Sequence, residues 1–277
     1  MVMPWLRKLP IIKQFADIYS KSTRQRLDLV DGYINLHKQT WDPNYSRDFV
    51  DSFLCEMDKQ KGDQSNNTYF NEEQLRWVLF DLFIAGIDTT STTIHWIFSF
   101  LSAHPQCQVR AQQEVDQVLG TEGRPSYTTR SSLPYIQAII QEIFRMRPVF
   151  PLGIPRKTKT NVDFMGYKIP KGTPVFANLW AVHNDPAIWI DPEEFRPERH
   201  ISSTGEFMPS DKIIPFSTGV RLCPGKLVAQ TTIYIILIKT LQRFTLSFPP
   251  DQSNPNLDGT SLFALSPRKI RILFTER

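Results

Sequence analysis

The chain has 277 residues, of which 41% are hydrophobic and 22% are charged, and its net charge is +4. This composition is typical of a globular protein with a sizeable core, and the weak positive charge without a basic stripe argues against nucleic-acid binding. The three cysteines, Cys55, Cys107 and Cys223, lie far apart and include no CxxC pair. A disulfide framework is therefore not expected, and a reducing compartment is favoured.

No apolar run in the sequence is long enough to span a bilayer. The first segment, MVMPWLRKLPII, carries Arg7 and Lys8 inside an apolar run and has no small-residue cleavage site, so it is not expected to be a signal peptide. Its mixture of large apolar and basic residues predicts a segment that rests on a membrane surface or, alternatively, a helix entry packed on the rest of the fold.

Apolar periodicity and helix breakers predict a helix-rich protein. Helices are expected over residues 10–39, 47–58, 71–101, 105–119, 133–146 and 225–243, with a polar loop at 59–68. Between residues 157 and 180, Gly and Pro punctuation and β-branched residues predict short strands and hairpins. The end, SLFALSPRKIRILFTER, predicts a final strand pair. The predicted fold class is α-rich α+β with small sheets attached.

The longest predicted helix has a capped start and a polar middle. Asn71 is a candidate N-cap, and Gln74 follows three residues later, as in a capping box. The stretch from Ala85 to Thr93 contains Gly86 and five consecutive hydroxyl residues, which favour helix less than their neighbours do. The stretch predicts either a local opening that holds water and passes protons from a carboxylate, or hydroxyls that bond to carbonyls of their own helix.

Glu142 and Arg145 lie three residues apart, on one face of the helix predicted over 133–146. Apolar neighbours on both sides indicate that the pair is buried. A buried ion pair needs further hydrogen-bond partners, so we expect additional donors and acceptors around it.

The segment PFSTGVRLCPGK, residues 215–226, surrounds Cys223 with glycines and prolines. Pro224 suits the first position of the following helix, which would place the Cys223 sulfur at or near the N-cap, where free N–H groups and the helix dipole favour a thiolate. Gly219 and Gly225 allow the backbone to approach a flat, bulky group, and Arg221 supplies a cation for a carboxylate. A thiolate in such a setting suits heme iron as an axial ligand.

Other uses of Cys223 have less support from the sequence. A buried, inert cysteine is the usual fate of a lone Cys. A nucleophilic cysteine requires a histidine partner, and the five histidines form no recognisable motif of that kind. A zinc site requires more ligands than one.

Four motifs in order make the chain resemble the cytochrome P450 family. The segment from Phe216 to Gly225 fits FxxGxRxCxG, and the segment from Ala85 to Thr90 resembles the oxygen-activation stretch of the family's long central helix. Glu142-x-x-Arg145 resembles the ExxR pair, and the segment from Phe195 to Arg199 resembles the FxPxR element. The opening PWLRKLP and the later DPNYSRDFVDSFLCEM are similar to microsomal family 2 enzymes.

The resemblance implies heme b as cofactor, with Cys223 as the axial ligand of its iron. Arg221 and Arg156 match positions that hold the heme propionates, and Phe216 and Gly225 match further cofactor-binding positions. By the same resemblance, Asp88 and Thr89 would be catalytic and deliver protons during oxygen activation, whereas Glu142, Arg145 and Arg199 would form a structural network. The positions that match substrate-contact segments are Ala85, Leu152, Ile154, Leu262 and Phe263.

The resemblance covers residues 1–277 as one partial P450 domain, with mid-chain helices and a linker at 1–70. The long central helix and the helices after it occupy 71–156, and small sheets, the cysteine loop and the last helix occupy 157–277. It implies a monooxygenase for a lipophilic substrate, with electrons from an NADPH-dependent reductase, at a membrane surface on the cytosolic face of the endoplasmic reticulum. The chain is expected to lack roughly the first half of the family pattern.

Two alternatives to this monooxygenase stay open. The chain is either an enzyme or a truncated, non-catalytic remnant that keeps the motifs but retains no heme. A heme-thiolate isomerase or dehydratase is a third possibility, and the Asp88–Thr89 pair argues against it.

Overall fold

The computed structural model describes residues 10–60, 69–252, 255–261 and 263–277, with side chains from Lys13 onward. Most of the opening segment MVMPWLRKLPII, most of the polar loop predicted at 59–68, and Leu262 lie outside the described residues. The chain forms two compact units, Met1–Gly86 and Ile87–Arg277, and each is described by itself.

The first unit is built from helices α1 (Pro10–Thr40), α2 (Phe49–Lys59) and the beginning of α3 (Glu72–Ala103). Its core residues recur at helical spacing on each of the three helices, which is why these segments bury one face. They are Leu27, Val30, Ile34, Val50, Phe53, Leu54, Leu75, Leu79 and Phe80. Ion pairs between Asp31 and Arg76 and between Lys38 and Glu72 tie α1 to α3 within this unit.

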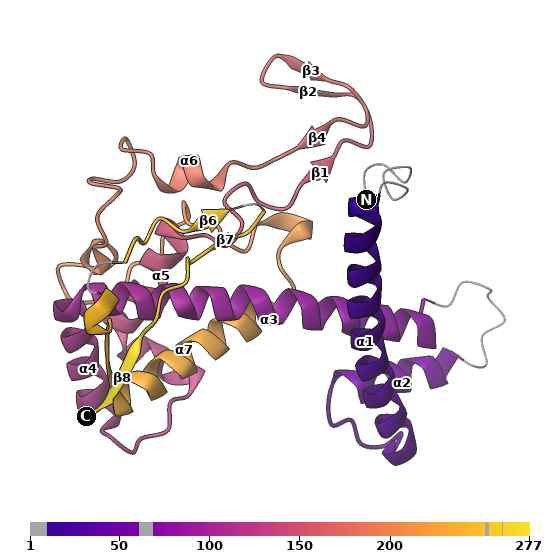
Figure 1. The fold of residues 1–277 in the computed structure, drawn as a ribbon, viewed down its shortest axis with the longest axis horizontal. Helices are drawn as coiled ribbons and strands as arrows, with labels where there is room; N and C mark the ends of the chain where they lie inside the picture. Colours follow the sequence, from indigo (N-terminus) through magenta and orange to yellow (C-terminus); the bar gives the residue numbers. More distant parts are fainter. Residues whose placement is uncertain (1–9, 61–68, 253–254, 262) are drawn as a thin grey trace. The chain divides into compact units, whose positions relative to one another are not determined.

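Helix α3 begins as the sequence predicted and continues without a break (Figure 1). The Asn71 Oδ1 atom accepts a hydrogen bond from the Gln74 N–H at 2.9 Å, which confirms the predicted N-cap. In the polar middle, the Ser91 hydroxyl donates to the Ile87 carbonyl at 2.8 Å and the Thr93 hydroxyl donates to the Thr89 carbonyl at 2.9 Å. Of the two alternatives, hydroxyls that bond to carbonyls of their own helix are confirmed at these two residues, and the local opening is wrong there.

The remaining helices belong to the second unit. They are α4 (Pro105–Leu119), α5 (Pro134–Met146), α6 (Leu179–His183) and α7 (Lys226–Arg243), with 3-10 turns η3 (Tyr127–Ser132), η4 (Pro197–His200), η5 (Gly219–Arg221) and η6 (Pro250–Gln252). Helix α5 is buried almost all around, and it packs with α4, α7 and the later half of α3 in one hydrophobic core. The predicted helix boundaries agree with these within a few residues, but α6 was not predicted.

Four two-stranded antiparallel sheets occur in the described part of the second unit. They pair β1 (Arg156–Lys157) with β4 (Pro174–Val175), β2 (Val162–Phe164) with β3 (Tyr167–Ile169), β5 (Phe244–Ser247) with β8 (Leu273–Glu276), and β6 (Thr260–Ser261) with β7 (Leu265–Ser266). The strands predicted between 157 and 180 are confirmed. The final strand pair predicted within residues 261–277 is wrong in its pairing, because β7 pairs with β6, and β8 pairs with β5, the strand directly after α7.

Among the described residues, no helix is both long enough and apolar enough to cross a membrane. Large apolar side chains are nevertheless exposed in the first unit. On α1, Phe15 is 68% exposed and Tyr19 is 62% exposed, whereas side chains of this size are usually buried.

Candidate functional site

The Cys223 loop is a tightly folded turn held by its own backbone. The Cys223 N–H donates to the Phe216 carbonyl at 2.9 Å, and the Leu222 N–H donates to the Gly219 carbonyl at 3.0 Å. Gly219 has a φ of 69° and Ser217 has a φ of 64°. This left-handed conformation suits glycine and strains serine, which indicates that the surrounding structure enforces the turn.

Helix α7 begins slightly later than the sequence predicted. Its N-cap is Gly225 and its first residue is Lys226, so the expectation that Pro224 occupies the first helical position is wrong. Cys223 lies two residues before the N-cap, and its carbonyl accepts the Lys226 N–H at 3.3 Å. The shift arises because the turn around Cys223 closes on itself before the helix starts.

The sulfur of Cys223 is available to a ligand. Cys223 is a free, half-buried cysteine, and its Sγ atom makes no hydrogen bond with any described residue. Apolar side chains on both sides of it in the sequence are exposed, namely Val220, Leu222, Leu227 and Val228. Exposed apolar side chains close in sequence to an unused ligand atom are what a flat apolar group with a central metal would cover.

Two cations near this loop lack carboxylate partners in the described structure. The Arg156 guanidinium on β1 donates only to the Ser217 hydroxyl, at 3.4 Å, which brings β1 to the loop. Arg221 is exposed and has no hydrogen bond or ion pair to a described residue. A thiol, exposed apolar side chains and two arginines without acidic partners fit a heme with its propionates.

Phe216 and Gly225 contribute to the loop in different ways. The Phe216 ring packs edge-on against Phe144 of α5, with centroids 5.2 Å apart, and so anchors the loop to the core. A Cβ atom added at Gly225 would lie 3.9 Å from the Cys223 sulfur, an ordinary contact distance. Contacts within the chain therefore do not require glycine at position 225. That a bound cofactor requires glycine there stays a prediction.

A buried ion cluster lies around Glu142 on α5. Its carboxylate accepts hydrogen bonds from Arg145 Nε and Nη2, both at 2.9 Å, from Arg199 Nε at 3.0 Å and from the Arg196 N–H at 3.1 Å. His200 Nε2 lies 2.8 Å from Glu142 Oε2, the oxygen that also accepts from Arg145 Nε. The predicted burial and additional partners are thus present in the geometry, whereas Arg196 and His200 were missed although they flank the motif arginine.

The protonation of Glu142 follows from these contacts. Burial alone would raise the pKa of this carboxyl, but hydrogen bonds from Arg145 and His200 outweigh burial and lower its pKa to about 2. The fully buried Arg145 guanidinium also donates to the His183 carbonyl at 2.9 Å and lies 5.5 Å from the Trp189 ring centroid. Each oxygen of Glu142 thus has at least two hydrogen-bond partners, and the structural role of the network stays a prediction.

The residues predicted for protons and substrate on α3 lie on consecutive turns. Ala85 is exposed and belongs to the first unit, whereas Asp88, also exposed, and Thr89, partly buried, belong to the second. All three residues belong to helix α3. Their roles stay predictions.

The other predicted substrate positions that the structure describes are exposed, and one of them, Phe263, contacts Phe150. Leu152 and Ile154 are 51% and 47% exposed in the segment after α5, and Phe263 is 56% exposed. The Phe263 ring lies 5.2 Å from the Phe150 ring, and the Leu265 N–H donates to the Val149 carbonyl at 2.7 Å. The structure therefore brings two sequence-distant candidate segments together.

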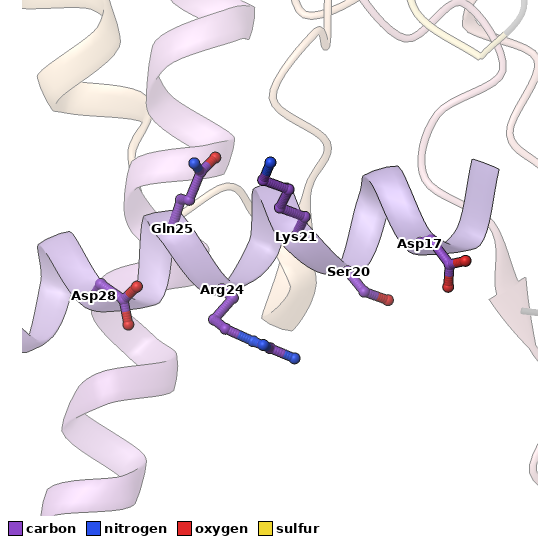
Figure 2. Close-up of a pocket in the computed structure, with 6 residues that line it drawn as sticks. All are labelled: Asp17, Ser20, Lys21, Arg24, Gln25 and Asp28. Carbon is purple, nitrogen blue, oxygen red and sulfur yellow. The ribbon is translucent and has the colours of Figure 1, made fainter. Parts of the chain in front are cut away.

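Two polar groups in the first unit do not form comparable sites. One pocket is lined by six side chains that all come from α1, as Figure 2 shows: Asp17, Ser20, Lys21, Arg24, Gln25 and Asp28. Because a single helix supplies every lining residue, nothing in this pocket encloses a ligand.

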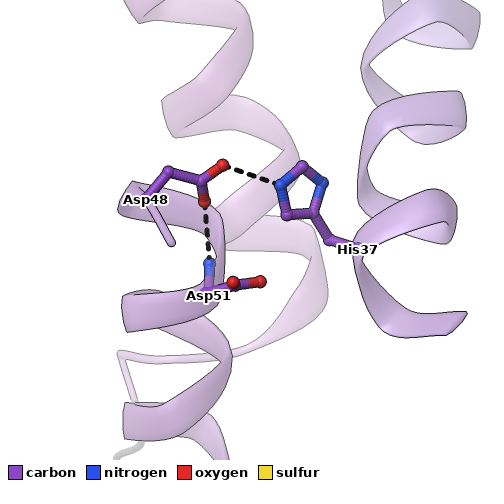
Figure 3. A group of neighbouring side chains, drawn as sticks. All are labelled: His37, Asp48 and Asp51. Atoms are coloured by element: carbon purple, nitrogen blue, oxygen red, sulfur yellow. Dashed lines mark hydrogen bonds and ion pairs between the residues drawn. The ribbon is translucent and has the colours of Figure 1, made fainter. Parts of the chain in front are cut away.

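The second group joins α1 to α2 (Figure 3). His37 Nε2 lies 2.7 Å from Asp48 Oδ2, and the other Asp48 oxygen caps α2 by accepting the N–H groups of Val50 and Asp51. The buried Asp51 carboxylate is already paired with Arg47 in a two-point contact. Donor groups of the chain itself already bind these carboxylates, so the group has a structural role and joins α1 to α2.

Comparison with known proteins agrees with this geometry. The cytochrome P450 family profile matches residues 1–274, and the chain belongs to the cytochrome P450 family. The α-rich α+β architecture with a long helix and small sheets is that of a partial P450 fold, as predicted.

The similar curated proteins come from P450 family 2. Cytochrome P450 2U1 of Homo sapiens is 34% identical over 100% of this chain and 50% of its own length. Cytochrome P450 2D6 of Pan troglodytes is 36% identical over 95% of this chain and 53% of its own, and cytochrome P450 2J2 of Homo sapiens is 36% identical over 98% and 53%. The chain thus spans about half the length of the curated relatives it matches.

Proposed function

We propose that this protein acts as a heme-thiolate monooxygenase, which inserts one oxygen atom from O2 into a lipophilic organic substrate and releases the other as water. The observation that carries the proposal is the Cys223 loop, which has a free, half-buried cysteine and exposed apolar side chains on both sides of it in the sequence. Cys223 would hold the iron, and Arg156 and Arg221 would hold the propionates. When bound, heme supplies the electron-transfer and O2 chemistry.

The chain's own residues would handle protons and substrate. Reduction of O2 to water consumes protons, and the adjacent carboxylate and hydroxyl of Asp88 and Thr89 are suited to hold and pass them. Leu152, Ile154 and Phe263 offer exposed apolar surface for a lipophilic substrate. Family membership supports electron supply by an NADPH-dependent reductase on the cytosolic face of the endoplasmic reticulum membrane.

The test is a spectrum of the protein expressed with heme, reduced, and exposed to carbon monoxide. A thiolate-ligated heme gives a Soret band near ~450 nm. A protein that purifies without heme, or precipitates through its exposed apolar side chains, would instead support the non-catalytic remnant.

The isomerase alternative is separated by a second measurement. In the full-length protein with its reductase, Thr89→Ala should leave NADPH consumption in place while product formation falls, because proton delivery is impaired. Unchanged coupling of the two would remove the proton-handling role of Thr89, and product formed without NADPH would favour an isomerase.

A further inference from the structure

His183 is a buried residue without a predicted role. It is the last residue of α6 and is 0% exposed, although histidine usually reaches solvent. It belongs to none of the four sequence motifs. Its backbone carbonyl and its imidazole contact different parts of the second unit.

The backbone of His183 is bound to the Glu142 cluster. Its carbonyl accepts a hydrogen bond from Arg145 Nη1 at 2.9 Å, and the same guanidinium holds Glu142 through its other nitrogens. The neighbouring turn is fixed as well, because the Trp189 indole donates to the Val182 carbonyl at 2.9 Å. The position of the His183 ring is therefore set by α5 and its ion cluster.

The imidazole of His183 contacts the segment that leads into the Cys223 loop. The Ile214 N–H donates to His183 Nε2 at 3.4 Å. Ile214 in turn accepts the Ser217 N–H at 3.0 Å, and Phe216 accepts the Cys223 N–H at 2.9 Å. Consecutive hydrogen bonds and covalent links thus run from the imidazole to the backbone of the cysteine.

The contact with Ile214 defines the state of the ring. Because Nε2 accepts, the ring is neutral and its proton is on Nδ1, which makes no well-formed hydrogen bond to a described residue. Burial lowers the pKa of His183 to about 4, although backbone carbonyls of Arg145 and Lys212 favour the charged ring. A buried donor without a partner is costly, so Nδ1 does not account for the burial of this ring. The imidazole atom that binds another part of the second unit is the acceptor Nε2.

We propose that His183 is a positioning residue, which links the Glu142 cluster to the segment before the cysteine loop and thereby fixes the Cys223 sulfur in the orientation that heme iron requires. This inference rests on the proposed function only for its last part. The link between the imidazole and the loop concerns the chain itself and can be measured without heme.

Three variants of the full chain separate positioning from packing. His183→Phe keeps a ring but removes the acceptor, and His183→Gln places a side-chain oxygen within reach of the Ile214 N–H. Ile139→Val is the control, because Ile139 is a fully buried residue of α5 whose truncation weakens the core while both hydrogen bonds of His183 stay in place. Should His183→Phe fail to fold, His183→Asn replaces it, since it is smaller and too short to reach Ile214.

The first readout is hydrogen–deuterium exchange of the peptide covering residues 213–223, measured without heme. Loss of one hydrogen bond at the base of the loop should speed its exchange about five- to tenfold, Gln should restore most of the protection, and the control should leave the loop at the wild-type rate. Exchange that rises equally in His183→Phe and the control, or that Gln does not restore, would overturn the inference.

The second readout is the reduced carbon monoxide spectrum of the heme-loaded variants. His183→Phe should lower the fraction of the thiolate band, and His183→Gln should recover it. A wild-type chain without that band, but with the exchange pattern described, would contradict the proposed function and leave the link between His183 and the loop standing. A full thiolate band in His183→Phe would show that His183 does not position the sulfur.

Discussion

Replacing Glu142 by glutamine tests whether the buried ion cluster stabilises the second unit. The substitution keeps the side-chain shape and one acceptor oxygen but removes the charge that faces Arg145, Arg199 and His200. Arg145 is fully buried, so it would be left with an uncompensated positive charge.

The magnitude follows from the protonation of Glu142. Its pKa falls from 4.5 to about 2 on folding, which corresponds to about 3 kcal/mol of stability. Breaking a buried pair by removing one partner costs a similar ~3–5 kcal/mol. Because the folded-state pKa is the lower one, this stabilisation is complete above pH 4.5 and is lost as the pH falls toward 2.

The assay is urea unfolding at pH 7, followed by far-ultraviolet circular dichroism and by tryptophan fluorescence, since Trp189 lies beside Arg145. Glu142→Gln should lower the free energy of unfolding by about 3 kcal/mol. The matched control is Glu206→Gln, at an exposed position outside the cluster, which should change it by less than about 0.5 kcal/mol. A loss below about 1 kcal/mol in Glu142→Gln would refute the reasoning, because the cluster would then contribute no more than a surface pair.

Three further predictions concern stability. Gly259→Ala should lower the free energy of unfolding by ~2 kcal/mol or more, because its φ is 80° and a Cβ would lie 2.8 Å from the Trp96 ring; an unchanged melting temperature would contradict this. Gln108→Leu should lower the free energy of unfolding in urea by ~2 kcal/mol, because the buried amide donates one hydrogen bond to the backbone of Leu246 in β5 and accepts another from it. An unchanged free energy of unfolding would show that these two hydrogen bonds contribute no stability. The hydrogen bond from Arg47 lowers the pKa of Asp51 from 3.8 to about 2. The free energy of unfolding of the wild type should therefore fall relative to that of Asp51→Asn as the pH falls below about 4. Unfolding free energies of the two proteins that run parallel over this pH range would refute the pairing.

The helices of this fold were predictable because their signals are local. Asn71 before an acidic turn, Pro105 at the start of α4 and Gly120 after it mark helix ends through capping chemistry, and the structure places them there. The partner of β8 was not predictable in this way. Pairing of β8 with β5 joins segments separated by the β6–β7 hairpin, and such pairing depends on tertiary packing.

For the candidate site, as for the fold, only the features with local sequence signals were predicted. The sequence identified Cys223, Arg221 and the pair of Glu142 with Arg145, since each stands in a motif with fixed spacing. No role could be predicted for His183 and His200, because their partners lie 31 and 58 residues away in sequence and only folding brings them together. The start of α7 was misplaced because the turn at Cys223 is closed by backbone hydrogen bonds, which cannot be predicted from a pattern of side chains.

The most direct test of the central claim is the reduced carbon monoxide spectrum of Cys223→Ser beside that of Cys55→Ser, both expressed with heme in the longest available form of the protein. If Cys223 is the iron ligand, the Cys55 variant keeps the Soret band near ~450 nm and the Cys223 variant loses it, since a serine oxygen does not replace a thiolate. An unaltered band in Cys223→Ser would contradict the account.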